Sequence, residues 1–495
     1  MSGSQIPPEQ ENAVHDGGQL WDAIVVGAGP AGCAAAYDLA TAGLSVLLLD
    51  HKDFPRAKAC AGGLTSKAVQ ALRYSIAPVV RKVVGRVRLE GDPDFLHAAP
   101  DMTARAAFVK ESRMKLANDG KLYRKSGVNP SCSPADAVVL KSREPICVMT
   151  VRAELDAYCL RQTIAAGACL RRIAGVQQIE RRGDEVLLLA PGESYRARFL
   201  VGADGASGQT RRLCAAGSWF SRGFALEVQT AAPPEEVDLT FDFASVSNGY
   251  AWIFPKGDHL NVGVYSLSPA SGLTRSMLLS YVKSRVGAET VDDVVGQYLG
   301  IGAGENPAEY VQADLRDRVF LVGDAGGFVD PLTGEGIYGA LVSGQAAAKA
   351  ILAEVRGEST AADAFARHIA GYRQTLRFSS RAAAAFYANP SRGFRAMRLP
   401  FVRRSLVRTY THGLNVNSLA MRIALAHCCG PLHYAALPSV HVCGFQYGKP
   451  HEVRQRHQPQ QEIRGSVVEG PAVSLNPQQM LGAPFAPISC GSLWR

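Results

Sequence analysis

Three closely spaced glycines and one later carboxylate are the residues of this chain whose types and spacing have the clearest chemical meaning. Gly27 permits a tight turn, Gly29 lets backbone N–H groups approach an anion, and Gly32 allows a helix to sit close to a sheet. Asp50 can accept hydrogen bonds from ribose hydroxyls and would repel a 2′-phosphate. Together these residues predict a site for the pyrophosphate and ribose of FAD or NAD, and they disfavour NADP there.

The sequence around these residues supplies the elements that must position them. Residues 23–26 predict a buried strand, residues 31–42 a helix and residues 44–49 a second strand, because apolar runs of strand length flank an alanine-rich segment. Strand, glycine turn, helix and strand form a complete βαβ unit with Asp50 at its end. The glycine pattern is therefore far more specific than it would be alone.

A second glycine-rich segment lies far downstream and distinguishes FAD from NAD. Residues 319–322 predict a strand, and the carboxylate of Asp324 at its end can accept a hydrogen bond from a ribityl hydroxyl. The turn from Gly334 to Gly336 exposes N–H groups at the start of a helix predicted over residues 336–352, where they suit the electron-rich edge of a reduced flavin. NAD has no group that needs these contacts. The alternative for Asp324 is a helix cap after a buried strand.

Two more charged residues are predicted to approach the cofactor. Asp204 follows another strand and glycine turn, in residues 199–212, and occupies a place equivalent to that of Asp324. An ordinary strand-to-helix turn is the alternative. Arg152 begins a predicted helix and can meet the pyrophosphate or the flavin, or else be a solvated arginine at a helix start.

Cys60 is the thiol with the most suggestive neighbours in the sequence. It follows Arg56 and Lys58, whose positive charges would favour a thiolate if they lie near it in space. The alternative is a buried and inert cysteine, which is the commoner case for a single thiol.

An aromatic hairpin is predicted between residues 249 and 264. Tyr250, Trp252 and Phe254 alternate along the first strand, and a turn follows at residues 256–258. Three rings on one face can form the wall of an apolar tunnel. The alternative is that they are simply the core of the sheet.

The composition fits an enzyme with two or three domains. The chain has 495 residues, of which 47% are hydrophobic and 20% charged. A net charge of +9 predicts attraction to anionic surfaces, with lipid favoured over nucleic acid because no nucleic-acid-binding motif accompanies the charge. The eleven cysteines have no repeated spacing, which predicts reduced cytoplasmic thiols and no metal site.

A second signal of membrane attraction lies in residues 391–414, where arginines alternate with large apolar side chains. This composition predicts an interfacial amphipathic segment and a peripheral position on a membrane, and a solvated helix with a packed underside is the alternative. No stretch is long and apolar enough to cross a bilayer, since charged residues and prolines interrupt residues 419–445. Residues 1–20 show no signal peptide, and we expect this lead to be disordered.

Four longer motifs carry a resemblance to a known family: FPRAKACAGGLT, VRAELDAYCLRQ, GYAWIFPKGDHLNVGV and GDAGGFVDPLTGEGIYGA. They lie between residues 21 and 352, and the chain resembles the geranylgeranyl reductase family of FAD-dependent oxidoreductases, within the para-hydroxybenzoate hydroxylase-like fold. The resemblance implies noncovalent FAD and reduction of isoprenoid double bonds. It implies flavin contacts at Ala31, Asp50, Cys60, Ala61, Gly63, Arg152, Asp324, Gly336 and Ile337.

The chain departs from the family pattern at two places. The family usually has CGGG where this chain has Cys60, Ala61, Gly62 and Gly63, and it usually has serine where Gly208 stands. The first departure lies near the expected chemistry and bears on substrate or rate. Residues 109–149 match no pattern of the family.

The patterns and the resemblance together predict an α/β fold with a Rossmann-like FAD-binding domain, an interleaved substrate domain built on a mixed sheet, and C-terminal helices. The predicted FAD-binding segments are residues 21–90, 150–215 and 310–352. The predicted substrate-domain segments are residues 91–149 and 216–309. Helices are expected in residues 353–440 and a disordered tail in residues 446–495.

The first functional hypothesis is a reductase of a prenyl chain carried on a lipid, quinone, pigment precursor or diphosphate. Cys60, Tyr250 and Trp252 are the residues predicted to act at the double bond, with His259 as another acid. The reductant, such as NADPH or ferredoxin, must be external, because the glycines at residues 300–304 follow no predicted strand and form no second nucleotide site. The alternatives are a flavin monooxygenase of an apolar substrate and a non-catalytic or electron-transfer flavoprotein.

Overall fold

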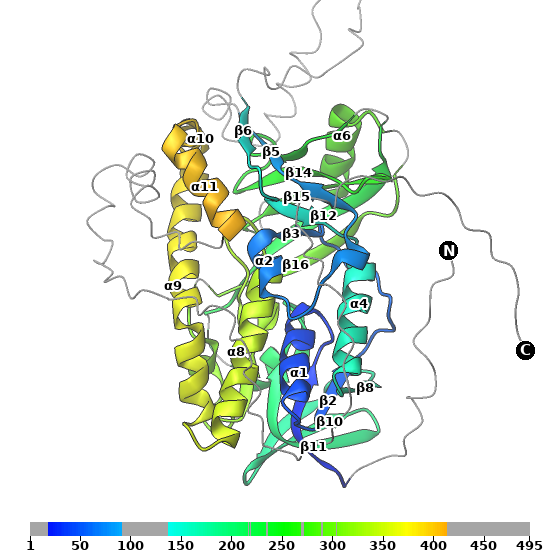
Figure 1. Ribbon diagram of the computed structural model, residues 1–495, viewed down its shortest axis with the longest axis vertical. Coiled ribbons are helices and arrows are strands. Elements are labelled where there is room, and N and C mark those ends of the chain that lie inside the picture. Colours follow the sequence, from blue (N-terminus) through cyan, green and yellow to red (C-terminus); the bar gives the residue numbers. More distant parts are fainter. Residues whose placement is uncertain are drawn as a thin grey trace, which may run out of the picture. The chain divides into compact units, whose positions relative to one another are not determined.

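The structure is a computed structural model that describes residues 18–91 and 137–412, apart from short gaps at 216, 218, 234–235, 269–271, 289–290 and 303 (Figure 1). The expectations for the N-terminal lead up to residue 17, for residues 92–136 and for everything after residue 412 lie outside the described residues.

The first sheet contains the predicted βαβ unit. Its strands run in the order β8-β2-β1-β11-β10-β9, with β17 also paired to β11. The bounds are β1 Leu20–Val26, β2 Val46–Asp50, β8 Cys169–Arg172, β9 Gln178–Arg182, β10 Glu185–Ala190, β11 Glu193–Gly202 and β17 Val319–Leu321. Strands β8, β2, β1, β11 and β17 are parallel, so their carboxyl ends meet at one edge.

Both faces of this sheet are apolar and buried, and helices cover one of them. Ala23 and Val25 face the core that contains α1 (Pro30–Thr41), α4 (Arg152–Ala165) and α8 (Ile337–Val355). Ile24 and Val26 face a second core on the other side. In Figure 1, α1 lies between α4 and α8, and it packs against both.

The second sheet contains the aromatic hairpin. Its order is β16-β12-β15-β14-β13-β5-β6, antiparallel except for the β13–β5 pair. The bounds are β5 Arg86–Glu90, β6 Val138–Lys141, β12 Ser221–Ala231, β13 Leu239–Asp242, β14 Gly249–Pro255, β15 His259–Ser266 and β16 Val295–Ile301. Helix α6 (Arg275–Arg285) covers the face that carries Ile253 and Val262, and Tyr250 and Trp252 point to the other face.

Short elements connect the two sheets. A three-stranded sheet of β3 (Gly63–Thr65), β7 (Cys147–Met149) and β4 (Lys82–Val84) lies in the connection. The remaining short helices are α2 (Ser66–Ala71), η2 (Ala77–Val79), α5 (Gln209–Cys214), α7 (Pro307–Tyr310) and η6 (Gly323–Gly326).

Three C-terminal helices close the described part of the chain: α9 (Ala361–Ala388), α10 (Pro390–Met397) and α11 (Pro400–His412). In Figure 1, α9 runs along α8, and α10 and α11 lie at its far end. Phe394 is buried in the same core as Tyr250, and Met397 and Leu406 pack against it, while Phe401 is 41% exposed. Phe394, Met397 and Leu406 therefore face the protein, as in the packed alternative, whereas Phe401 does not. None of the helices that the structure describes combines the length and the apolar character needed to cross a membrane.

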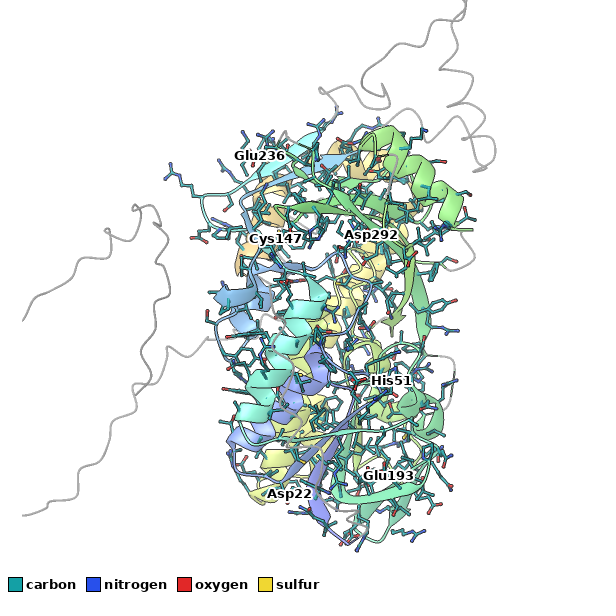
Figure 2. The ribbon with its side chains drawn as sticks, turned by 90° about the vertical axis from the view of Figure 1, so that its right-hand side faces the viewer. Asp22, His51, Cys147, Glu193, Glu236 and Asp292 are labelled. Carbon is teal, nitrogen blue, oxygen red and sulfur yellow. The ribbon has the colours of Figure 1, made fainter. Side chains whose placement is uncertain are left out.

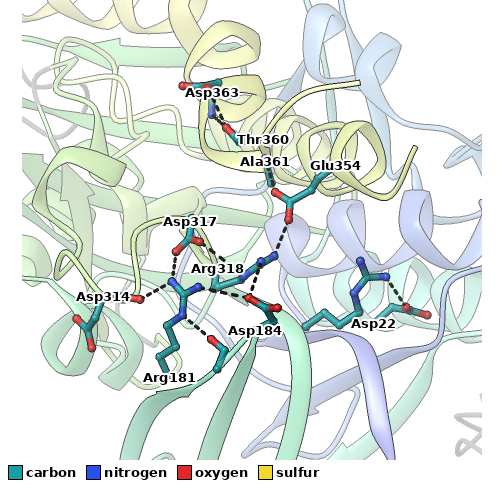
Figure 3. Close-up of polar contacts among 12 residues, drawn as sticks. Asp22, Arg181, Asp184, Asp314, Asp317, Arg318, Glu354, Thr360, Ala361 and Asp363 are labelled. Atoms are coloured by element: carbon teal, nitrogen blue, oxygen red, sulfur yellow. Dashed lines mark hydrogen bonds and ion pairs between the residues drawn. The ribbon is translucent and has the colours of Figure 1, made fainter. Parts of the chain in front are cut away.

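A cluster of charged side chains holds the N-terminal end of β17 in place (Figure 3). Arg318, which immediately precedes this strand, pairs with Glu354 of α8 at 2.6 Å. Glu354 also accepts the Ala361 N–H at 2.6 Å, which ties the α8–α9 turn to the same point. Arg181 of β9 pairs with Asp317 at 2.6 Å. The cluster thus sets the register of the strand that leads to Asp324.

The α/β prediction is confirmed, and two details differ from it. Gly300 lies within strand β16, so the statement that no strand precedes the glycines of residues 300–304 is wrong. The strand is an edge of the antiparallel sheet, and a Cβ at Gly300 would lie 1.8 Å from the Asp324 carbonyl oxygen, so close packing explains this glycine. Strand β5, assigned to the first domain by sequence, pairs in the second sheet.

The close approach of α1 and α8 gives a stability prediction. A Cβ at Gly344 would lie 2.2 Å from the Ala31 carbonyl oxygen. We expect Gly344→Ala to lower the free energy of unfolding by about 1–3 kcal/mol, because it overpacks the contact. Urea unfolding measures this, with Lys349→Ala on the exposed side of α8 as control. An increase in stability, as for a glycine in an open helix position, would contradict this packing.

Candidate functional site

One cavity of about 750 Å³ joins the carboxyl edge of the first sheet to the aromatic face of the second. Every site residue predicted from the sequence lines it except Gly32 and His259: Gly27, Gly29, Ala31, Asp50, Cys60, Ala61, Gly63, Arg152, Asp204, Tyr250, Trp252, Asp324, Gly334, Gly336 and Ile337. The structure therefore brings these residues together, and what each of them does remains a prediction.

The glycine turn has the form that an anion site requires. Gly27 has φ +103°, and a Cβ there would lie 2.5 Å from the Ala203 carbonyl oxygen. A Cβ at Gly32 would lie 1.8 Å from the Gly27 carbonyl oxygen, which explains why Gly32 packs below the cavity. A Cβ at Gly29 would instead meet only Arg56, at 3.4 Å, so Gly29 faces open space. Gly29 also begins α1 and forms no side-chain cap, which leaves the first N–H groups of the helix available.

Asp50 fixes this turn from the neighbouring strand. Its carboxylate accepts the Ala28 N–H at 2.7 Å and the Lys52 N–H at 2.9 Å. The side chain is buried but still lines the cavity, so a ribose hydroxyl would share a carboxylate that is already held by the backbone.

Three cationic side chains, Arg56, Lys58 and Arg152, gather at this end of the cavity. The Asp156 carboxylate accepts two hydrogen bonds of 2.9 Å from Arg152 and forms an ion pair with Arg56 at 3.2 Å. Arg56 Nε is buried and has no hydrogen-bond partner among the described residues. Lys58 is half-buried, and desolvation and the nearby charge of Arg152 lower its pKa. An unpartnered guanidinium N–H beside an open glycine turn fits the pyrophosphate of FAD.

The second glycine segment faces the same cavity. Asp324 accepts the Gly300 N–H at 3.3 Å, and burial raises the pKa of this carboxyl. Gly334 has φ +67°, and Gly336 begins α8 and forms no side-chain cap. A Cβ at Gly336 would lie only 3.5 Å from the Asp324 carboxylate, so the helix start and the carboxylate adjoin.

Asp204 has a structural role that accounts for one departure from the family pattern. Its carboxylate accepts the Thr210 N–H at 2.9 Å and the Thr210 hydroxyl, which is the strand-to-helix turn considered as the alternative. A Cβ at Gly208 would lie 2.1 Å from the Asp204 carboxyl carbon. A serine at this position would require the Asp204 carboxylate to move.

Cys60 has different charged neighbours from those that the sequence suggested. Arg56 is engaged with Asp156, and the cations that interact with the Cys60 thiol are Arg152 and Lys256. Arg152 is only 7% exposed, so it is neither solvated nor free. Burial opposes its charge, but Asp156 and Cys60 outweigh burial and raise the pKa of Arg152.

The segment after Cys60 shows why alanine is tolerated where the family usually has the second residue of CGGG. Gly62 has φ +62°, and a Cβ at Gly63 would lie 2.8 Å from the Phe254 ring. Both positions therefore need glycine. Ala61 has no positive φ, and its carbonyl accepts a hydrogen bond from Lys256, so alanine fits there.

The aromatic hairpin is both sheet core and cavity wall. Tyr250, Trp252 and Phe254 belong to one buried cluster and also line the cavity. The Tyr250 hydroxyl donates to the Thr333 carbonyl, and Trp252 Nε1 donates to Asn261 Oδ1 at 2.7 Å. The two interpretations of the rings are therefore compatible.

Sequence reasoning missed three polar residues beside Cys60: Glu227, Lys256 and Asn261. Lys256, which the sequence assigned to a hairpin turn, is 3% exposed and donates to the Thr150 carbonyl at 3.0 Å. Burial lowers the pKa of Lys256 to about 8. Glu227 had a detectable signal, because it is a charged residue between apolar neighbours at an inward position of a strand.

A second, polar cavity of about 960 Å³ meets Cys60, Arg152 and Glu227 from the other side. His51 from the first sheet and Asp292 near the second, both labelled in Figure 2, line it. His259 faces this cavity and lies 2.8 Å from Asp258 in the hairpin turn.

Comparisons with known proteins agree with this geometry. Residues 22–292, more than half of the chain, match the family described as FAD dependent oxidoreductase. A digeranylgeranylglycerophospholipid reductase of Methanosphaera stadtmanae is 28% identical over 351 residues, which cover 67% of this chain and 78% of the relative.

Two solved structures share the fold. A geranylgeranyl bacteriochlorophyll reductase-like protein of Thermoplasma acidophilum has a TM-score of 0.55 and 19% identity, covering 82% of this chain and 96% of its own. The flavin-dependent brominase Bmp2 has a TM-score of 0.57 and 17% identity, covering 83% of this chain and 94% of its own.

The open space at Gly29 gives a test of cofactor binding. We expect the purified protein to carry noncovalent FAD, and Gly29→Val to abolish binding because its side chain would enter the path of the pyrophosphate. Flavin absorbance and heat release measure this. Thr41→Val, at the exposed end of the same helix, should keep its flavin. A folded Gly29→Val protein with full flavin content would contradict the assignment.

Proposed function

Because the chain belongs to the FAD-dependent oxidoreductase family, we propose that it is a reductase that saturates double bonds of a geranylgeranyl or other polyprenyl chain. The prenyl chain would be carried on a lipid, quinone, pigment precursor or diphosphate. The digeranylgeranylglycerophospholipid reductase named above supports this substrate class, as does the resemblance of the hairpin motif.

The observation that carries the proposal is the apolar end of the first cavity, the one of about 750 Å³. Beyond Cys60 the lining is almost entirely hydrocarbon and aromatic: Val87, Leu89, Leu140, Ile146, Phe241, Phe243, Tyr250, Trp252, Phe254, Leu299, Phe386, Met397 and Leu406. Residues of the second sheet, α9, α10 and α11 all contribute to it. A prenyl chain offers only apolar groups, so such a lining matches it along its length.

The protein's own residues would bind the cofactor and position the double bond. When bound and reduced, FAD supplies hydride chemistry. The glycine turn, Arg56 and Lys58 would hold its pyrophosphate, and Gly334 to Ile337 would lie along its ring. An isolated double bond is a poor hydride acceptor, so the aromatic wall acts by holding the chain close and excluding water.

A flavin monooxygenase of an apolar substrate is the second candidate. The shared fold with a flavin-dependent brominase and the tryptophan of the hairpin favour it. A non-catalytic or electron-transfer flavoprotein is the third. Oxygen separates them, since only the monooxygenase needs it.

For the reductase we propose an external donor such as NADPH or ferredoxin, and a peripheral position on a membrane would suit a lipid substrate.

The apolar lining predicts how activity depends on chain length. With dithionite-reduced protein and no oxygen, geranylgeranyl diphosphate should gain hydrogen in two-hydrogen steps, and farnesyl and geranyl diphosphates should bind progressively more weakly. Each buried methylene contributes about 0.8 kcal/mol, so long chains gain most. Mass spectrometry of the products and competition binding measure both effects.

Trp252→Ala should weaken binding of the longest chain most, and Phe401→Ala on the exposed side of α11 is the control. Oxygenated product formed only in air would favour the monooxygenase instead. Flavin that is reduced and reoxidised with no change in any prenyl substrate would favour the electron-transfer role.

Cys60 lies where the two cavities meet, which predicts a role in the reaction. We expect Cys60→Ser to keep its flavin but to lower turnover or to change which double bond is reduced, since the thiol interacts with Arg152 and Lys256. Cys169→Ser in β8, which lines neither cavity, is the matched control. Product patterns and rates equal to those of the unmodified protein would leave Cys60 a packing residue.

A further inference from the structure

We propose that the Glu227 carboxyl is the proton donor to the double bond. This inference rests on the proposed function, which assigns the hydride but leaves the source of the proton open. Saturating a double bond adds one hydride to one carbon and one proton to the other. Glu227 would give its proton to the second carbon, remain as a carboxylate, and take a new proton from solvent.

The register of the second sheet places Glu227 beside the aromatic wall. Glu227 of β12 pairs with Gly263 of β15, and Gly263 pairs with Trp252 of β14. Residues opposite one another in an antiparallel sheet point to the same face. A Cβ at Gly263 would lie 2.1 Å from the Trp252 ring, so the ring extends over this glycine toward Glu227.

Two hydrogen bonds hold the Glu227 carboxyl in place. The Cys60 backbone N–H donates to it, and so does the side-chain amide of Asn261. The amide orientation of Asn261 is fixed, because its Oδ1 accepts Trp252 Nε1 at 2.7 Å and its N–H groups are left for Glu227. The same tryptophan that forms the wall thus orients the acid through Asn261.

The surroundings favour a carboxyl that keeps its proton. Glu227 is 4% exposed, and burial raises its pKa above the ordinary value of 4.5. The hydrogen bonds and the charges of Lys256 and Arg152 oppose this increase without cancelling it. The Lys256 ammonium is itself engaged with the carbonyls of Ala61 and Thr150.

The other acids that line the first cavity are committed to different partners. Glu335 pairs with Lys67 at 2.7 Å and accepts the Thr65 hydroxyl at 2.5 Å. Asp50 and Asp204 hold backbone turns, as described above. Asp324 lies at the helix start of the cofactor end. Among the described residues that line this cavity, only Glu227 joins an acid to the aromatic face and to Cys60.

Glu227 also has a route to solvent. It lines both the first cavity, which holds the aromatic wall, and the more polar cavity of about 960 Å³. A carboxyl in this position can deliver a proton on the dry side and recover one from the wet side. His259, the other acid suggested by the sequence, lines only the polar cavity.

The test compares Glu227→Gln with the unmodified holoprotein. Glutamine keeps the size and the hydrogen-bond acceptor but holds no acidic proton. We expect unchanged flavin content and a rate of geranylgeranyl diphosphate reduction at least about 100-fold lower, within the usual contribution of a general acid. Glu236→Gln, an exposed carboxylate of the same domain, is the control and should lose nothing.

Two further measurements distinguish proton donation from a structural role. The rate of the unmodified protein should fall as pH rises through the raised pKa of Glu227, because only the protonated form donates, and this limb should be absent in Glu227→Gln. The infrared spectrum of the resting oxidised protein should contain a protonated carboxyl band that persists above pH 4.5 and that Glu227→Gln lacks.

The outcomes separate this inference from the proposed function. If the unmodified protein reduces the prenyl chain and Glu227→Gln is equally fast, or if the infrared band is absent, Glu227 is not the donor and the reductase stands. If Glu227→Gln fails to fold, Glu227→Asp tests the same point, since a retracted carboxyl should slow the reaction and keep the band. If the unmodified protein reduces no prenyl chain, both proposals fail.

Discussion

The site depends on how the short segment from Cys60 to Gly63 is held between the two sheets. The carbonyl of Gly62 accepts both the N–H and the hydroxyl of Thr150, at 2.8 and 3.0 Å. A Cβ at Gly62 would lie 2.2 Å from the Thr150 carbonyl oxygen, so only glycine permits this approach. Buried Lys256 then ties Ala61 to the hairpin. Burial of these polar groups is costly unless all are paired, and the pairing therefore fixes one geometry.

This segment divides the space between the sheets into two chemically different cavities. The first cavity, of about 750 Å³, has an apolar end formed by hydrocarbon and aromatic side chains, and the second is lined by polar residues that include His259, Asn261 and Asp292. Separation of this kind suits a reaction that needs a dry double bond and a renewable proton. At the cofactor end, two arginines, Arg56 and Arg152, share the single carboxylate of Asp156. One positive charge is therefore left for a bound anion to neutralise.

Much of the cofactor end could be predicted from the sequence because its signals are local. Gly27, Gly29 and Asp50 belong to one βαβ unit whose spacing follows from strand and helix lengths. The partners of Cys60 could not be predicted, because Arg152, Glu227 and Lys256 reach it from three distant elements and only the fold brings them together. For the same reason the sequence left the packed underside of α10 and α11 as one of two alternatives. Periodicity shows that Phe394 and Leu406 are apolar, but it does not show what they pack against.

A crystal structure of the FAD complex with a geranylgeranyl lipid would test the account most directly. The account predicts the pyrophosphate at Gly29 and Arg56, and a prenyl chain along Trp252 with one double bond within reach of the Glu227 carboxyl. A chain bound outside the aromatic cavity, or a double bond that Glu227 cannot approach, would contradict it.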